Sequence, residues 1–200
     1  METTSDTPWS SQAATLHNRW SRHIDADYRQ TMLRLVCNEL KIHPEWTVLD
    51  AGCGPGIFYE LLPYAFRFNY IGIDWEKDMI KYCMFNYPHG VFCRANILEL
   101  IPSADLVITM NVIQHIGNFE KAIQNLIASA RHKVIFCERT HDGITSNIPD
   151  PKIMRWRFNP DDFLRLMKTD GWFEPLIVKE EVRDMNGEPT LAIYSMERQS

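Results

Sequence analysis

Short apolar runs alternate with amphipathic stretches along the middle of the chain. Apolar runs of this length, bounded by turn residues, predict buried β-strands at 46–50, 70–74, 91–95, 105–110 and 133–138. Between these runs, apolar residues recur every three or four positions, which predicts helices at 58–64, 76–86 and 118–130. Strands and helices that alternate in this way are typical of a parallel sheet covered by helices on both faces.

The C-terminal part departs from this alternation. Asn159-Pro160-Asp161-Asp162 has the chemistry of a helix start, and the helix is expected to end near Thr169. Two further strands are expected at 173–183 and 190–196, joined through the hairpin signal Asn186-Gly187. The predicted fold is therefore α/β, with a mostly parallel seven-stranded sheet, helices on both faces and an antiparallel C-terminal hairpin.

The 200 residues suffice for one well-buried domain. An amphipathic helix is predicted from Asp25 to Ile42, after a polar stretch without periodicity. About twenty residues after strand 133–138 are rich in Gly, Pro, Asn and Asp, and a loop of that length inside a compact domain is usually functional. We interpret the chain as one domain with an N-terminal helical cap, a core, a substrate lid loop and a C-terminal helix with hairpin, at 1–43, 44–138, 139–158 and 159–200.

Composition and charge narrow the range of possible functions. Twenty-one Lys and Arg residues against 26 Asp and Glu residues give a net charge of −5, which disfavours nucleic acid as a partner. No apolar run is long enough for a membrane helix, and the first residues carry no export signal, so we expect a cytoplasmic protein. Five cysteines without a C-x-x-C pair indicate neither a disulfide framework nor a metal site.

The strongest motif is Val48-Leu49-Asp50-Ala51-Gly52-Cys53-Gly54-Pro55-Gly56, a strand that ends in a carboxylate and continues into three alternate glycines. A dinucleotide-binding G-x-G-x-x-G turn would need a glycine where Ile57 stands, and a phosphate-binding P-loop would end in Gly-Lys-Ser/Thr. Alternate glycines instead let the backbone pass close to a bulky ligand. Twenty-four residues later, Asp74 ends the next strand, where its carboxylate could accept hydrogen bonds from a ribose diol.

On these residues the sequence resembles the class I S-adenosylmethionine-dependent methyltransferases, whose first motif has the form D-x-G-x-G-x-G. The resemblance covers roughly Trp46 to Met196 and implies a Rossmann-like fold with S-adenosyl-L-methionine as cofactor. Asn96 departs from the family, in which an acidic residue often contacts the adenine amino group. The cofactor-binding residues expected from this resemblance, with aromatics that could cover the cofactor, are Asp50, Gly52, Cys53, Gly54, Asp74, Trp75, Asn96, Ile97, Met110, Trp20 and Tyr28.

Methyl transfer is an in-line displacement, and a base is needed only when the acceptor loses a proton. The candidate catalytic residues near the strand ends are His115, Asn111 and Glu138. The segment 139–158 carries four basic against two acidic residues, opposite to the charge of the chain, which favours an anionic acceptor. The expected substrate-binding residues are Arg139, Arg155, Trp156 and Arg157.

The leading hypothesis is a methyltransferase that acts on a small molecule. Alternatives are a methyltransferase acting on a macromolecule, a non-catalytic methyltransferase-like partner subunit and, against the evidence of Ile57, a nicotinamide-dependent oxidoreductase. The acceptor, the methylated element among O, N, C and S, and the oligomeric state are left open by the sequence. Each glycine or aromatic also has a plain structural interpretation, as a turn or as core packing.

Overall fold

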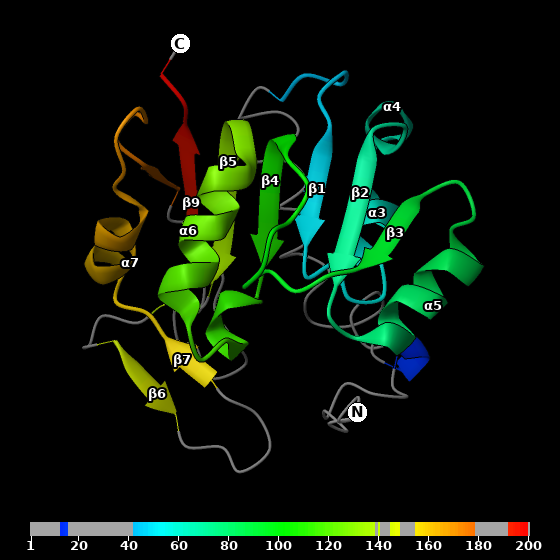
Figure 1. Ribbon diagram of the computed structural model, residues 1–200, viewed down its shortest axis with the longest axis horizontal. Coiled ribbons are helices and arrows are strands. Elements are labelled where there is room, and N and C mark those ends of the chain that lie inside the picture. The colour runs from blue at the N-terminus through cyan, green and yellow to red at the C-terminus, as the bar shows by residue number, and fades with distance from the viewer. Residues whose placement is uncertain are drawn as a thin grey trace.

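The computed structural model describes residues 13–15, 42–138, 140, 145–148, 155–178 and 192–199. Its centre is a seven-stranded sheet with the order β3-β2-β1-β4-β5-β9-β8 (Figure 1). Five of these strands are mutually parallel and span Val48–Ala51 (β1), Tyr70–Asp74 (β2), Val91–Arg94 (β3), Ala104–Met110 (β4) and Ala130–Glu138 (β5). The last strand, Ala192–Glu197 (β9), lies antiparallel between β5 and Leu176–Val178 (β8). The expected fold class is confirmed.

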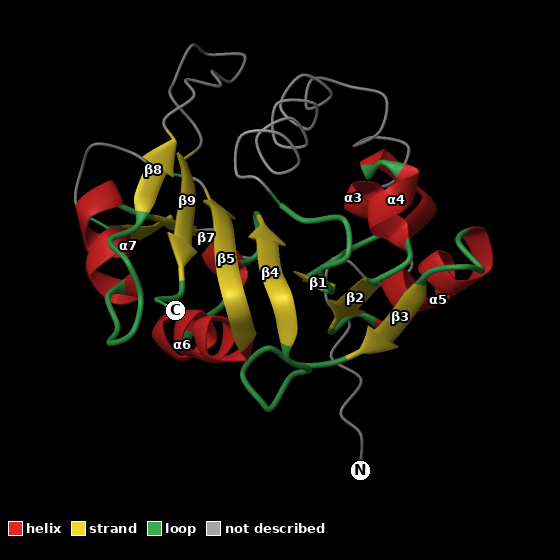
Figure 2. Cartoon of the chain, turned by 90° about the horizontal axis from the view of Figure 1, so that it is seen from above, coloured by secondary structure: helices red, strands yellow, loops and turns green. Residues whose placement is uncertain are grey.

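Helices cover both faces of the sheet (Figure 2). Phe119–Ser129 (α6) and Pro160–Met167 (α7) pack on one face, around a core that includes Phe136 and Tyr194. The opposite face carries a second core, which includes Tyr70 and Ile108 and is covered by three helices, Ile57–Leu61 (α3), Tyr64–Arg67 (α4) and Lys77–Asn86 (α5). No helix in the part of the chain that the structure describes has the length and apolar character to cross a membrane.

Three local predictions differ from the structure. The strand expected from Phe173 begins only at Leu176, because Pro175 has no N–H to pair in a sheet. The single helix expected at 58–64 ends at Leu61, and a separate short helix begins at Tyr64. Pro63 causes the break, because the residue before a proline avoids helical backbone angles, and Leu62 has φ −60° and ψ 136°. Strand β5 begins at Ala130 rather than Lys133, because α6 runs directly into it without a loop.

The segment 139–158 is not wholly irregular where the structure describes it. Ser146–Ile148 (β6) and Arg155–Arg157 (β7) pair as a small antiparallel sheet, which the sequence pattern does not predict. The predicted start of α7 is confirmed, since Asn159 Oδ1 accepts hydrogen bonds from the backbone N–H of Asp161 and of Asp162. The cap helix predicted from Asp25 and the Asn186-Gly187 turn lie outside the described residues, apart from Ile42.

A polar network joins three strands at the amino edge of the sheet. Asp105 Oδ2 accepts hydrogen bonds from the backbone N–H and the hydroxyl of Thr47, at 2.9 and 2.7 Å. Asp105 Oδ1 accepts from Arg131 Nε at 2.7 Å, and Arg131 Nη2 donates to Thr47 Oγ1 at 2.7 Å. The Arg131 hydrogen bond is the main reason that the pKa of Asp105 lies below its usual range. The network therefore fixes the starts of β1, β4 and β5 together.

We predict that Asp105→Asn lowers the free energy of unfolding at pH 7 by about 1–3 kcal/mol, because the charged acceptor of three donors is lost. Since the folded-state pKa is lowered, this stability is present above the unfolded pKa of about 4 and disappears as the pH falls further. Urea denaturation at several pH values measures both effects. Asp78→Asn, which breaks an exposed pair with Lys81, is the control and should cost less than about 0.5 kcal/mol.

Candidate functional site

The candidate site lies where the parallel strands end. The arrowheads of β1, β2 and β4 point to one edge of the sheet, and the small β6–β7 sheet lies beyond the same edge (Figure 1). In open α/β sheets ligands bind at the carboxyl ends of the strands. The residues that follow β1, β2, β4 and β5 are therefore the ones to consider.

The glycine loop after β1 has a backbone that only glycine adopts readily. Gly52, Gly54 and Gly56 have φ angles of 84°, 52° and 80°. A Cβ atom on Gly52 would lie 2.3 Å from Cγ2 of Val112, which belongs to the turn after β4. The backbone N–H groups of Gly52 and Cys53 both donate to the carbonyl of Ile73, at 2.8 and 2.9 Å. The loop is thus held against the end of β2 and packed on the turn after β4.

Asp74 ends β2 beside this loop. Its Oδ2 accepts a hydrogen bond from the N–H of Gly54 at 2.9 Å, and its Oδ1 accepts one from the N–H of Glu76 at 2.8 Å. Burial raises the pKa of Asp74, and these hydrogen bonds oppose the increase. Each carboxylate oxygen has two lone pairs, so Asp74 can still accept hydrogen bonds from the hydroxyl groups of a ligand.

Asp50 lies underneath the loop and is 1% exposed. Its Oδ2 accepts a hydrogen bond of 2.6 Å from the hydroxyl of Tyr70. Burial raises the pKa of Asp50 to about 7, the Tyr70 hydrogen bond opposes this, and the negative charge of Asp74 adds to it. The two acids expected from the sequence therefore occupy neighbouring positions, one buried and one partly buried.

The residues expected around adenine lie after β2 and β3. Trp75 is 49% exposed, and the Arg94 guanidinium lies 4.5 Å from its ring centroid while Arg94 Nε donates to the Trp75 carbonyl at 2.9 Å. Asn96 uses its side chain locally, because Oδ1 accepts from Leu98 N–H and Nδ2 donates to Glu99. Ile97 is buried in the core under α6. An exposed aromatic ring that is held on one side by a cation–π contact can still cover a flat ligand.

The turn after β4 carries two candidate catalytic residues. Asn111 has φ 56°, which is uncommon for a residue with a side chain, and its Oδ1 is buried without a hydrogen-bond partner among the described residues. The 3-10 helix Ile113–His115 (η2) follows, and the partly buried His115 is its last residue. Backbone strain and an unsatisfied buried acceptor at one residue are features that concentrate at ligand sites.

Glu138 is completely buried beneath this turn. Its carboxylate accepts hydrogen bonds from the backbone N–H groups of Val112, Ile113 and Gln114, at 3.0, 3.0 and 3.2 Å. Burial raises the pKa of Glu138 to about 7, and the three hydrogen bonds oppose the increase. With both oxygens engaged by backbone groups, the geometry favours a positioning role for Glu138 over the direct catalytic role expected from the sequence.

Trp156 brings the small β6–β7 sheet to the same turn. β7 packs against η2, and the Trp156 ring makes an edge contact with Phe119 at 4.9 Å between centroids. The indole Nε1 is buried and has no hydrogen-bond partner among the residues described. An unsatisfied donor on β7 and the unsatisfied acceptor of Asn111 therefore lie on two elements at the same edge of the sheet.

Other predicted site residues are placed less centrally. Met110 is partly buried against the core under α3 and α5, and Cys53 is buried, with Sγ 3.7 Å from the Gly54 carbonyl oxygen. Arg157 is exposed. Trp20, Tyr28, Arg139 and the side chain of Arg155 lie outside the described part of the structure.

Tyr70 and Val112 contribute to the candidate site but are not indicated by the sequence motifs. Their roles depend on which residues face each other across neighbouring strands. In the parallel pair β1–β2, Val48 is opposite Tyr70, which places Asp50 two residues further along on the same face of the sheet. The signal available in the sequence was a tyrosine at the start of a strand that stays apolar until Asp74 at its end.

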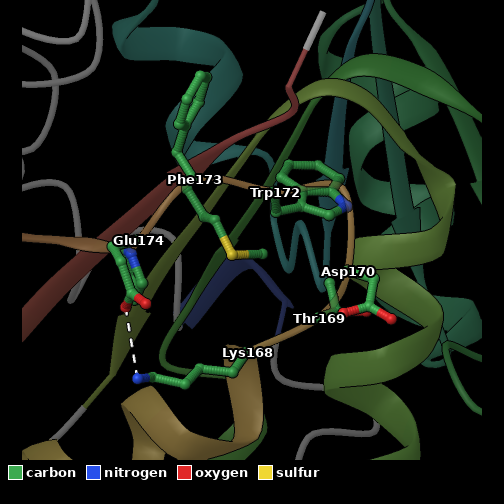
Figure 3. Close-up of a pocket in the computed structure, with 8 residues that line it drawn as sticks. Lys168, Thr169, Asp170, Trp172, Phe173 and Glu174 are labelled. Atoms are coloured by element: carbon green, nitrogen blue, oxygen red, sulfur yellow. Dashed lines mark ion pairs between the residues drawn. The ribbon is translucent and has the colours of Figure 1, made fainter.

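A surface hollow of about 280 Å³ lies elsewhere, among Lys168, Trp172, Phe173 and Glu174 (Figure 3). An ion pair of 3.5 Å between Lys168 Nζ and Glu174 spans part of it. The adjoining Arg198 N–H donates to the carbonyl of His132 near the start of β5, so this hollow borders the amino edge of the sheet. It is therefore separate from the candidate site at the carboxyl edge.

Comparison with known proteins agrees with this arrangement. A family model described as a methyltransferase domain matches residues 42–180. A trans-aconitate 2-methyltransferase from Rhodopseudomonas palustris is 29% identical over 106 residues, which is 52% of this chain and 41% of the relative. An uncharacterized protein of Methanocaldococcus jannaschii is 32% identical over 104 residues, which is 50% of this chain and 43% of that protein. The chain thus spans less than half the length of these two curated relatives.

The fold is also found among solved structures. The 1,6-didemethyltoxoflavin-N1-methyltransferase of Burkholderia thailandensis, solved with its substrate and S-adenosylhomocysteine bound, has a TM-score of 0.69. It is 14% identical, and the match covers 95% of this chain and 85% of that one. At this identity the similarity establishes the fold alone. Because the family match extends over residues 42–180, the chain belongs to the methyltransferase domain family.

Proposed function

We propose that the protein is an S-adenosylmethionine-dependent methyltransferase that acts on a small-molecule acceptor. The observation that carries this proposal is the contact between Gly52 and Val112. It places the glycine loop, which would hold the cofactor, directly against the turn with Asn111 and His115, which would receive the acceptor. Methyl transfer needs this proximity, because aligning two reactants can supply roughly 7–11 kcal/mol of the barrier.

The residues at the ends of β1 and β2 fit S-adenosylmethionine. Gly52 and Gly54 have positive φ angles that favour glycine, and because glycine has no side chain a bulky ligand could approach the loop backbone. Asp74 would accept hydrogen bonds from the ribose hydroxyl groups, and Trp75 would cover the adenine. Asp50 would supply negative charge beneath the methionine portion. When bound, the cofactor supplies a methyl group on a positively charged sulfur.

The acceptor side is built from Asn111, His115 and Trp156. Asn111 Oδ1 would accept a hydrogen bond from the acceptor, and Trp156 Nε1 would donate one, because both atoms are buried and unpartnered among the described residues. His115 would take up the proton if the acceptor is a hydroxyl group. Glu138 would act through the backbone of the turn, by holding Val112, Ile113 and Gln114 in place.

The basic segment 139–158 favours an anionic acceptor such as a small carboxylic acid. The trans-aconitate methyltransferases among the relatives are consistent with this class. The test is a screen for S-adenosylhomocysteine release with trans-aconitate, other di- and tricarboxylates, and their neutral esters. We expect turnover with carboxylates and none with the esters. Turnover only with a protein or nucleic acid substrate would show that the small-molecule proposal is wrong.

Gly52→Ala should abolish cofactor binding. The new Cβ would lie 2.3 Å from Val112 Cγ2, so the loop or the turn must move. Gly171→Ala is a matched control, because Gly171 also has a positive φ, of 81°, but no atom lies within 4 Å of its Cβ position. Both variants should lose about 1–2 kcal/mol of stability from backbone strain, and the overlap with Val112 should add to the loss for Gly52→Ala only. Isothermal titration with S-adenosylhomocysteine should show lost binding for Gly52→Ala alone, and equal affinities would contradict the role of this contact.

Trp156→Phe should weaken acceptor binding and leave the cofactor site intact. The variant keeps an aromatic ring against Phe119 but lacks the indole N–H. The polar group of the substrate that this N–H would pair with is then left without a hydrogen bond. That loss, of about 1–3 kcal/mol, corresponds to a rise in acceptor KM of roughly 5- to 150-fold. Trp172→Phe, the same change beside the distant hollow, should leave KM unchanged. A wild-type KM for Trp156→Phe would remove Trp156 from the acceptor site.

Glu138→Gln should slow methyl transfer without changing cofactor affinity, because an amide offers one acceptor oxygen where the carboxylate offers two. It should also flatten the pH dependence of stability. The pKa of Glu138 is about 7 when folded and about 4.3 when unfolded, so its contribution makes the free energy of unfolding fall as the pH rises between these values. Glu174→Gln, at the amino edge, is the control. An unchanged rate and pH profile would contradict the positioning role.

A further inference from the structure

Tyr70 places a hydroxyl group in the core beside the buried carboxylate of Asp50. Tyr70 begins β2, is 1% exposed, and packs against the rings of Tyr59 and Phe92, at 5.0 and 5.7 Å between centroids. Its hydroxyl donates the 2.6 Å hydrogen bond to Asp50 Oδ2. An O–H to carboxylate bond of this length is in the strong, charge-assisted range. Phenylalanine would fill the same space in the core, so the hydroxyl of Tyr70 is explained by its hydrogen bond to Asp50.

Among the groups around Asp50, Asp74 opposes its ionisation. Asp74, at the end of β2, and Cys53, in the glycine loop, interact with it electrostatically, and Cys83 of α5 interacts with both Tyr70 and Cys53. Burial disfavours a charged carboxylate, and so does the negative charge of Asp74. The hydrogen bond from Tyr70 is the contribution that favours the charged form. Whether Asp50 is charged at neutral pH thus depends on Tyr70.

The charge on Asp50 affects the proposed cofactor site because this residue lies directly before the glycine loop. Asp50 directly precedes Ala51 and the glycine loop, and its neighbour Asp74 holds that loop through Gly54. S-adenosylmethionine carries a sulfonium and an ammonium group, so an ionised carboxylate beneath the loop would attract it, and a neutral carboxyl would not. We propose that Tyr70 is a positioning residue for the cofactor site, which acts by orienting the Asp50 carboxylate and keeping it ionised. This inference rests on the cofactor site proposed above.

Tyr70→Phe is the direct test, with dissociation constants for S-adenosylmethionine measured by isothermal titration between about pH 5.5 and 9. For the wild-type protein we expect affinity to fall as the pH drops through about 7, where Asp50 takes up a proton. Loss of the hydrogen bond should move this midpoint about one pH unit higher. The dissociation constant at pH 7 should then rise about fivefold, and the two proteins should converge at the alkaline end.

Two further variants separate positioning from general stability. Tyr87→Phe is the matched control, because Tyr87 belongs to the same aromatic cluster but its hydroxyl donates to the carboxylate of Glu60. It should leave the midpoint unchanged. Asp50→Asn should remove the pH dependence, and adding Tyr70→Phe to it should change affinity no further, since the effect of Tyr70 passes through Asp50. Thermal unfolding identifies any variant that is only destabilised.

The outcomes are distinguishable. A wild-type midpoint in Tyr70→Phe overturns the inference, and so does an equal loss of affinity with and without Asp50→Asn. If Tyr70→Phe does not fold, the carboxyl ¹³C titration of Asp50 in the wild-type protein decides: a midpoint that coincides with the fall in cofactor affinity supports the inference, and one separated from it by more than about one pH unit overturns it. A wild-type protein that binds neither S-adenosylmethionine nor S-adenosylhomocysteine at any pH refutes the proposed cofactor, whereas binding without pH dependence refutes only the role of Tyr70 and Asp50.

Discussion

The close approach of Gly52 to Val112 is the constraint on which the site depends. Strands β1 and β4 are parallel neighbours, so the segments that follow them leave the same edge of the sheet side by side. At Gly52 they come so close that no side-chain carbon fits between them. A glycine here therefore does more than permit a turn. It allows the loop after β1 and the turn after β4 to form one continuous surface, and the proposed methyl transfer would take place across that surface.

Two buried carboxylates support the two halves of this surface. Asp50 lies beneath the loop and accepts a hydrogen bond from a tyrosine hydroxyl, whereas Glu138 lies beneath the turn and accepts hydrogen bonds from three backbone N–H groups. Burial raises the pKa of each to about 7, so both are costly to keep charged. Apolar residues of similar size would often make a more stable core. Groups that cost stability and lie beneath a candidate site are better explained by what they position than by packing.

Much of the fold could be predicted because it depends on local patterns. The alternation of apolar runs and amphipathic helices predicted the parallel sheet, and the glycine motif with Asp74 indicated the strand ends at which we propose the cofactor site. The contacts of Tyr70, Val112 and Glu138 could not be predicted in the same way. Each joins residues at least 20 positions apart, and depends on the register between strands or on the path of a turn. The β6–β7 pair was missed for a related reason, because strands of three residues are too short to show periodicity.

The charges near the proposed site suit two ligands of opposite sign, as the proposed cofactor and acceptor would be. Asp50 and Asp74 lie beneath and beside the glycine loop, where a cationic cofactor would bind. At the same edge of the sheet lies β7, which belongs to the stretch of sequence with more basic than acidic residues (Figure 1). Under the proposed function, basic residues of this stretch would attract the acceptor, and the two carboxylates would attract the cofactor and repel an anion. An anion drawn into the loop would meet two carboxylates close together, one of them nearly excluded from water. The acidic balance of the chain as a whole is therefore compatible with an anionic acceptor, because the local arrangement of charge decides which ligand each wall accepts.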